Sequence, residues 1–66
     1  MKPDYCKFEK LCKERGVTAA DVARNCGVWA SMFSDWKAGR SYPKTDNMAK
    51  VARFFGVSIE SLLEEA

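Results

Sequence analysis

Apolar residues recur at helical spacing along most of the chain, and glycine or proline interrupts the pattern at intervals. From Asp4, a good N-cap, to Arg15, the apolar residues fall on one side and most of the charged residues on the other, and Gly16 follows as a stop. No stretch alternates with period two for long enough to indicate a strand. The pattern therefore predicts an all-α protein whose first helix ends at Arg15.

Two short helical segments come next, each ending at a glycine. The first begins after Thr18, an N-cap with Asp21 three residues further on, which is a shortened form of the capping box, and it ends at Gly27. The second spans roughly 30–38 and ends at Gly39. Segments this short need tertiary packing to persist.

The remainder of the chain predicts two more helices. One follows the loop "RSYPK", in which Pro43 disfavours helix, and runs from "TDN" to Phe55 before Gly56. The other begins at the Ser58 cap, and its apolar residues are Ile59, Leu62 and Leu63. Together these segments predict a compact five-helix protein in which residues 1–66 form a single domain.

Size and composition limit what the chain can do. A chain of 66 residues with 47% hydrophobic and 30% charged residues can bury one core but has no room for a deep substrate cleft. No apolar run approaches the length of a membrane span, and no leader resembles a secretory signal. We therefore expect a cytoplasmic protein that does not enter a membrane.

The supply of chemically active side chains is small. The three cysteines form an odd set without framework spacing and histidine is absent, so we expect reduced thiols, no metal site and no cofactor. Nothing in the sequence assembles an acid–base or nucleophilic constellation, and a cysteine nucleophile would lack a base. We therefore expect no catalytic residues and no enzymatic activity.

Charge is distributed unevenly along the chain. All 11 lysines and arginines precede Ser58, whereas Glu60, Glu64 and Glu65 follow it, although the formal net charge is only +2. A basic body with an acidic tail suits a polyanionic partner, although a surplus this modest is also common on a solvated surface.

The stretch "TAADVARNCGVWASMFSDW", two short helices around a glycine turn, is typical of a helix-turn-helix. Over about residues 7–63 the chain resembles the lambda-repressor/Cro-like family, also called the XRE family. The positions that agree with the family pattern are Thr18, Val22, Ala23, Gly27, Val28, Phe33, Trp36, Gly39, Pro43, Val51, Phe55, Gly56 and Val57. The resemblance implies a five-helix lambda-repressor-like domain with the helix-turn-helix at about 18–38, encoded by a bacterium or a phage.

The aromatic residues of this stretch divide between core and surface. Phe33 and Trp36 lie three apart and are expected on the inner face of the third helix. Trp29 stands where the family usually has a capping Ser or Thr, so that cap is lost. Two interpretations of Trp29 remain open: its ring folds back over Met32 or Phe33 as a lid, or Trp29 and Met32 face a partner.

The resemblance also implies which residues face DNA. The third helix would enter the major groove, with base-facing residues Ala30, Ser31, Ser34 and Asp35. Backbone phosphates would be contacted from Thr18, Lys37, Arg40, Lys44 and Asn47. Lys37 and Cys12 stand where the family often pairs a Glu with an Arg, and we expect Cys12 to be an apolar core filler. Asp35 could accept a hydrogen bond from cytosine but repels phosphate, so the base-facing set is poor in bidentate readers.

Two functions follow from these features. The first is a sequence-specific DNA-binding transcriptional regulator of the Cro or repressor type, bound to double-stranded DNA as a homodimer, because one short helix reads too few base pairs. The alternative is a helix-turn-helix scaffold that serves as a protein–protein interaction module through Trp29 and its neighbours.

Overall fold

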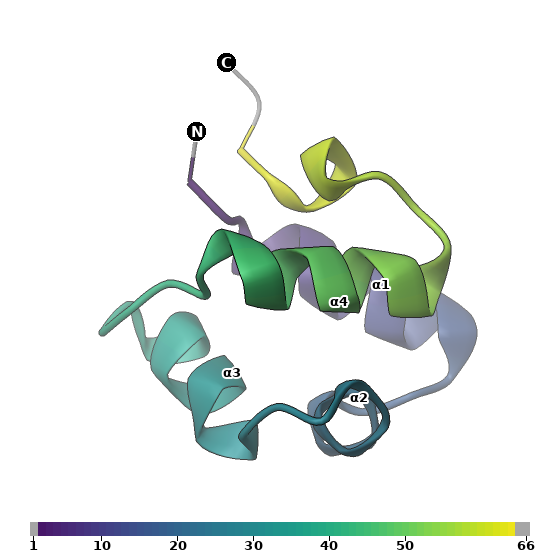
Figure 1. Ribbon diagram of the computed structural model, residues 1–66, viewed down its shortest axis with the longest axis horizontal. Helices are drawn as coiled ribbons and strands as arrows, with labels where there is room; N and C mark the ends of the chain where they lie inside the picture. The colour runs from purple at the N-terminus through teal and green to yellow at the C-terminus, as the bar shows by residue number, and fades with distance from the viewer. Residues whose placement is uncertain (1, 65–66) are drawn as a thin grey trace.

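Four α-helices and one short 3₁₀ helix make up residues 2–64, the part of the chain that the computed structural model describes (Figure 1). They are α1 (Tyr5–Arg15), α2 (Ala19–Cys26), α3 (Ala30–Ala38), α4 (Thr45–Phe55) and the 3₁₀ helix η1 (Ile59–Leu62). Met1, Glu65 and Ala66, which the sequence assigns to the same domain and its acidic tail, lie outside the described residues.

The starts and ends of the α-helices confirm the cap and stop signals. The Asp4 side chain accepts a hydrogen bond of 2.9 Å from the Cys6 amide at the start of α1. Gly27 ends α2 with φ 72°, a left-handed conformation that glycine adopts without a steric penalty and that reverses the chain toward α3. The predicted helix-turn-helix is therefore present at α2 and α3.

A complete capping box begins α2, as the sequence predicts. The Thr18 amide donates to the Asp21 carboxylate at 3.0 Å, and the Asp21 amide donates to the Thr18 hydroxyl at 3.1 Å. Hydrogen bonding of the charged carboxylate by Thr18, together with the nearby Arg24 guanidinium, lowers the pKa of Asp21 below its ordinary value of 3.8.

The prediction of a fifth α-helix is wrong, because residues 59–62 form a 3₁₀ helix. The Ser58 side chain does not cap it, and its hydroxyl lies 3.2 Å from that of Ser61 instead. With four residues and no side-chain cap, the segment cannot form a stable α-helical nucleus.

Backbone pairing between the two ends of the chain also prevents a longer helix. The Asp4 amide donates to the Leu62 carbonyl and the Glu64 amide donates to the Lys2 carbonyl, both at 2.8 Å. Leu63 is extended and forms an isolated antiparallel bridge with Pro3. An extended chain cannot continue a helix, and both ends of the described chain lie on the side away from α2 and α3 (Figure 1).

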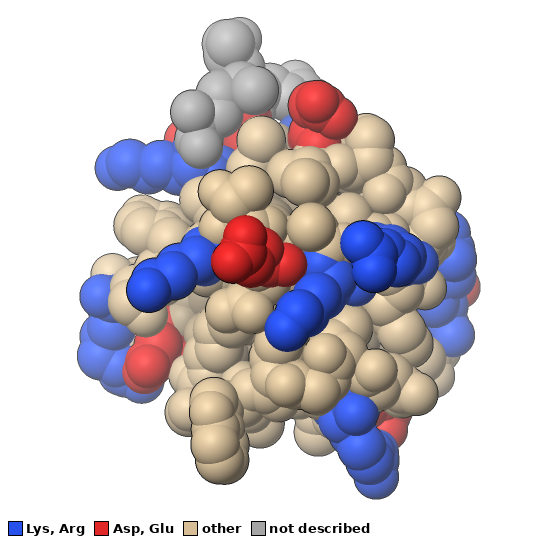
Figure 2. All heavy atoms as spheres, viewed as in Figure 1, with Lys and Arg blue, Asp and Glu red and all other residues tan. Residues whose placement is uncertain are grey.

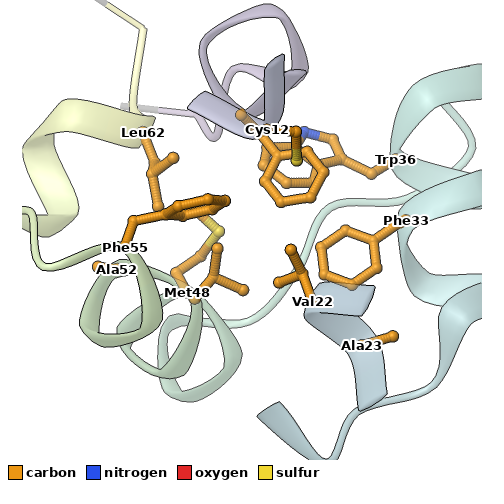
Figure 3. Close-up of a cluster of buried hydrophobic side chains, with 11 residues drawn as sticks. Cys12, Val22, Ala23, Phe33, Trp36, Met48, Ala52, Phe55 and Leu62 are labelled. Atoms are coloured by element: carbon orange, nitrogen blue, oxygen red, sulfur yellow. The ribbon is translucent and has the colours of Figure 1, made fainter. Parts of the chain in front are cut away.

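Side chains from all five elements converge on one hydrophobic core (Figure 3). Phe33 and Trp36 of α3 are 1% and 3% exposed, which confirms that both belong to the core. Phe8 of α1 is fully buried and stacks on Phe33 with ring centroids 4.7 Å apart. The buried Cys12 confirms its expected role as an apolar filler.

Trp36 is fixed by its polar atom as well as by its ring. Its indole Nε1 donates to the Pro3 carbonyl at 3.4 Å, and its ring meets Tyr5 edge-on at 5.3 Å between centroids. This contact ties the C-terminal half of α3 to the segment that precedes α1.

We expect Trp36→Ala to unfold or nearly unfold the protein. Truncation of a buried aromatic side chain costs about 3–5 kcal/mol, which approaches the total stability of so small a core. The matched control is Trp29→Ala, because the Trp29 side chain is 83% exposed. Thermal denaturation followed by circular dichroism should show a large decrease in melting temperature for Trp36→Ala and little change for Trp29→Ala. Similar decreases in melting temperature for both variants would contradict the assignment of Trp36 to the core and Trp29 to the surface.

Stability should depend on pH through Asp21. Because its folded-state pKa lies below the ordinary value of 3.8, the carboxylate stabilises the fold above that pH. This contribution decreases as pH falls below 3.8 and is lost once the pH passes the folded-state pKa. Melting temperatures of the wild type and Asp21→Asn should therefore differ near neutral pH and converge in strong acid. A constant difference across this range would show that the cap contributes nothing through its charge. Asp46→Asn, in the first turn of α4, is the control.

Candidate nucleic-acid interface

The turn between α2 and α3 is closed by backbone hydrogen bonds. The amides of Gly27 and Val28 donate to the Ala23 carbonyl at 3.0 and 3.1 Å. Ala23 is 4% exposed at this point, where a larger side chain would overpack the crossing of the two helices. The tight turn holds α3 against α2 and leaves the outer side of α3 in solvent.

The predicted base-facing residues lie on this outer side. Ala30, Ser31 and Ser34 are exposed, and the Asp35 side chain is 41% exposed. Because Phe33 and Trp36 occupy the opposite side, α3 has one face in the core and one face open to a partner. The structure thus brings these four candidates together on one helix face.

Asp35 is paired with Arg40, a contact that the sequence analysis missed. The Asp35 Oδ1 atom accepts a hydrogen bond from Arg40 Nε at 3.0 Å, and Nη2 lies 2.9 Å from the same oxygen in an ion pair. Arg40 lies five residues along the chain and beyond Gly39, so regular helical spacing gives no signal for the pair. Arg40, predicted to face phosphate, therefore lies beside a predicted base-facing residue.

A surface groove of about 450 Å³ runs between the start of α3 and the first turns of α4. It brings Trp29, Ser31, Met32 and Asp35 together with Asn47, which are all candidates from the sequence. Its walls also include residues that the sequence analysis did not name, Ser41 and Lys50. Lys50 follows Asn47 by three residues on α4, a spacing that places both on one side of that helix.

Trp29 is 83% exposed, so the interpretation of its ring as a lid over Met32 or Phe33 is wrong. Its backbone occupies the N-cap position of α3 without a side-chain cap, which confirms the loss of the cap. Met32 is half-buried and packs against the core. The large apolar surface of Trp29 is therefore open to solvent at one end of the groove.

The remaining phosphate candidates are exposed around the same helices. Lys37 is in the last turn of α3, and Lys44 is the N-cap residue of α4. Thr18 is exposed at the start of α2, but its own amide is already bonded to Asp21. On the face shown in Figure 2, basic side chains are spread over α4 and the edges of the molecule with acidic side chains between them. This face carries dispersed positive charge and no continuous basic surface.

The structure gives the cysteines little nucleophilic character. Burial raises the pKa of Cys12, and it also raises that of Cys26, where the charge of Lys50 opposes the effect. Both are therefore thiols at neutral pH, while Cys6 is exposed. Within residues 2–64, His, Cys, Asp and Glu side chains form no group of three that could hold a metal ion. No helix in the same part of the chain is long and apolar enough to cross a bilayer.

The fold is shared with a solved protein. The crystal structure of a transcriptional regulator from Listeria innocua superposes with a TM-score of 0.75, at 20% identity, over all of this chain and 65% of that one. At this identity the likeness concerns the fold alone. It supports the all-α fold of this chain.

Sequence relatives are regulators of transcription. The chain is 30% identical over 60 residues to the cryptic phage CTXphi transcriptional repressor RstR of Vibrio cholerae, covering 91% of this chain and 54% of that protein. It is 28% identical over 57 residues to the HTH-type transcriptional activator BcrR of Enterococcus faecalis, covering 86% and 28% of the two. It is also 28% identical over 58 residues to the HTH-type transcriptional regulator DdrOP3 of Deinococcus deserti, covering 88% and 45%.

The chain thus spans about half the length of these relatives or less. Residues 7–64 match the family model of the Cro/C1-type helix-turn-helix DNA-binding domain. This match includes α2, the turn, α3 and the loop to α4, and it confirms the resemblance found in the sequence. The chain therefore belongs to the family of Cro/C1-type helix-turn-helix DNA-binding domains.

Proposed function

We propose that the chain is a sequence-specific transcriptional regulator that binds double-stranded DNA with α3 in the major groove. The observation that carries this proposal is the division of α3 into a buried face, with Phe33 and Trp36, and an open face, with Ala30, Ser31 and Ser34. A helix held in this way presents its outer side chains at a fixed height above the domain surface, as groove recognition requires.

Backbone contacts supply most of the affinity in this proposal. Lys44 at the start of α4 and Lys37 at the end of α3 are exposed cations on either side of the loop. Asn47 adds a neutral contact from the first turn of α4, and Lys50 lies beyond it along the groove. At the other side of α3, the Thr18 hydroxyl and the N-terminal amides of α2 face a second phosphate. Asp21 weakens that contact because its carboxylate occupies the same helix end.

A homodimer on DNA follows from the size of α3. A helix of nine residues contacts only a few base pairs, too few for useful specificity. Two copies related by a two-fold axis would read two half-sites about one helical turn apart. We further propose that the protein acts in the cytoplasm, without a cofactor, a metal ion or a catalytic step.

A second candidate function rests on Trp29. An 83% exposed tryptophan beside the half-buried Met32 is typical of the aromatic anchors of protein interfaces. In that case the helix-turn-helix would be a scaffold for protein binding. Salt separates the two functions, because contacts with phosphate weaken steeply with salt and apolar contacts do not.

Lys44→Ala should weaken binding to all duplexes about equally and lower the magnitude of the salt slope by roughly 1. Lys10→Ala is the charge-matched control, since Lys10 lies on α1 in a hollow with Val57 and Ser61. Fluorescence anisotropy with labelled duplexes at several salt concentrations measures both slopes. An equal change in the two variants would mean that only net charge matters. Binding that ignores salt and is lost in Trp29→Ala would favour the second function.

A dimer should depend on the spacing of its half-sites. For a duplex selected from a random pool, inserting about 5 base pairs between the half-sites turns one to the opposite face and should reduce affinity strongly. Inserting about 10 base pairs, close to one full helical turn, returns both half-sites to the same face of the duplex and is the control. Equal affinity for a duplex with a single half-site would contradict dimeric binding.

A further inference from the structure

Arg40 is attached to Asp35 at two points. Gly39 ends α3 with φ 76°, and this left-handed residue lets the Arg40 amide donate to the Asp35 carbonyl at 2.9 Å. The Arg40 side chain then turns back to the Asp35 carboxylate, with Nε at 3.0 Å and Nη2 at 2.9 Å from Oδ1. The backbone hydrogen bond thus fixes the position of the Arg40 backbone, and the ion pair fixes the position of its guanidinium group.

The paired groups keep unused hydrogen-bonding capacity. The hydrogen bond from Nε and the ion-pair contact of Nη2 both go to Oδ1, so Oδ2 has no partner within residues 2–64. On Arg40, the Nη1 hydrogens are likewise unbonded within the described part of the chain. The side chains are 65% and 41% exposed for Arg40 and Asp35, so these atoms are open to a ligand.

This arrangement puts donors beside an acceptor. In the major groove a guanine–cytosine pair offers the acceptors N7 and O6 of guanine beside the amino donor N4 of cytosine. We propose that the Asp35–Arg40 pair is the specificity-determining element of the open α3 face. Arg40 donates to guanine and Asp35 accepts from the cytosine amino group. This inference rests on the proposed function, because it needs α3 in the major groove.

Charge favours this role over the contact with phosphate that the sequence predicts for Arg40. The carboxylate beside Arg40 cancels most of its attraction for a phosphate. In turn, Arg40 removes the repulsion that a lone carboxylate would meet near the DNA backbone. The pair has no net charge, so it would recognise a base pair through its hydrogen-bond donors and acceptors and not through charge attraction.

Among the predicted base-facing residues of α3, the pair has no competitor. Ala30, Ser31 and Ser34 have no forked donor that could contact one base twice. Two further exposed ion pairs within residues 2–64 join Lys13 to Glu9 on α1 and Arg24 to Asp21 on α2. Arg24 thus provides a matched control, an arginine in an exposed pair on a helix outside the open α3 face.

The test is selection of duplexes from a random pool, followed by affinity measurements with each base substituted at each position. The wild type should require guanine–cytosine at one position of each half-site, with a penalty of roughly 5- to 150-fold for other pairs. Arg40→Met keeps a long unbranched side chain without any donor, and Asp35→Ala loses the acceptor, so both should flatten the preference at that position. Arg24→Met removes the same charge from α2 and should leave the preference unchanged.

An atomic version of the test uses 7-deazaguanine, which lacks only the N7 acceptor, at the selected position. This base should weaken binding by the wild type and leave binding by Arg40→Met nearly unaffected. Circular dichroism of each variant establishes that the fold is intact. If Arg40→Met retains the full guanine preference, Arg40 does not read that base and the inference is overturned, while the proposed function stands. If the wild type binds no duplex even at low salt, the proposed function itself fails.

Discussion

The stacking of Phe8 against Phe33 is the contact on which the orientation of α3 depends. Phe8 is fully buried and lies 4.7 Å from Phe33, 5.3 Å from Trp36 and 6.0 Å from Phe55 between ring centroids. One side chain of α1 therefore joins α3 to α4. A helix as short as α3 is not stable by itself in water, so its direction is set by these contacts and by its packing on α2. A change in α1 can alter what α3 presents without touching its open face.

Within α3, the side chains that stabilise the fold are different from those that are open to a partner. Helical geometry sends Phe33 and Trp36 inward while Ser31 and Ser34 point outward. Substitutions at exposed positions away from caps and ion pairs usually change stability by less than about 0.5 kcal/mol. The open face can therefore vary in sequence while the fold is kept. This division explains how one fold can carry an outer face as poor in charge as this one.

The sequence predicts the α-helices well because their boundaries are local. Asp4 and the Thr18 capping box act on amides two or three residues away, and Gly27 acts at its own φ angle. The end of the chain is different, since the extension after η1 depends on backbone bonds to the N-terminal segment, which leave no periodic signal. The pairing of Arg40 with Asp35 escapes prediction for a related reason, because it crosses a left-handed residue.

The two ends of α3 are where local rules and structure disagree. At the start, Trp29 occupies a capping position and caps nothing, which forgoes about 1 kcal/mol, and its ring gains no burial in return. Just beyond the other end, Arg40 folds back on the helix and neutralises its acidic side chain. Between these two ends, the outward residues are small and neutral and provide no charge and no forked hydrogen-bond donor. A protein departs from local consistency mainly at functional sites. In the proposed complex with DNA, selectivity would therefore be concentrated at the ends of the open α3 face, while its middle would allow close approach to the groove.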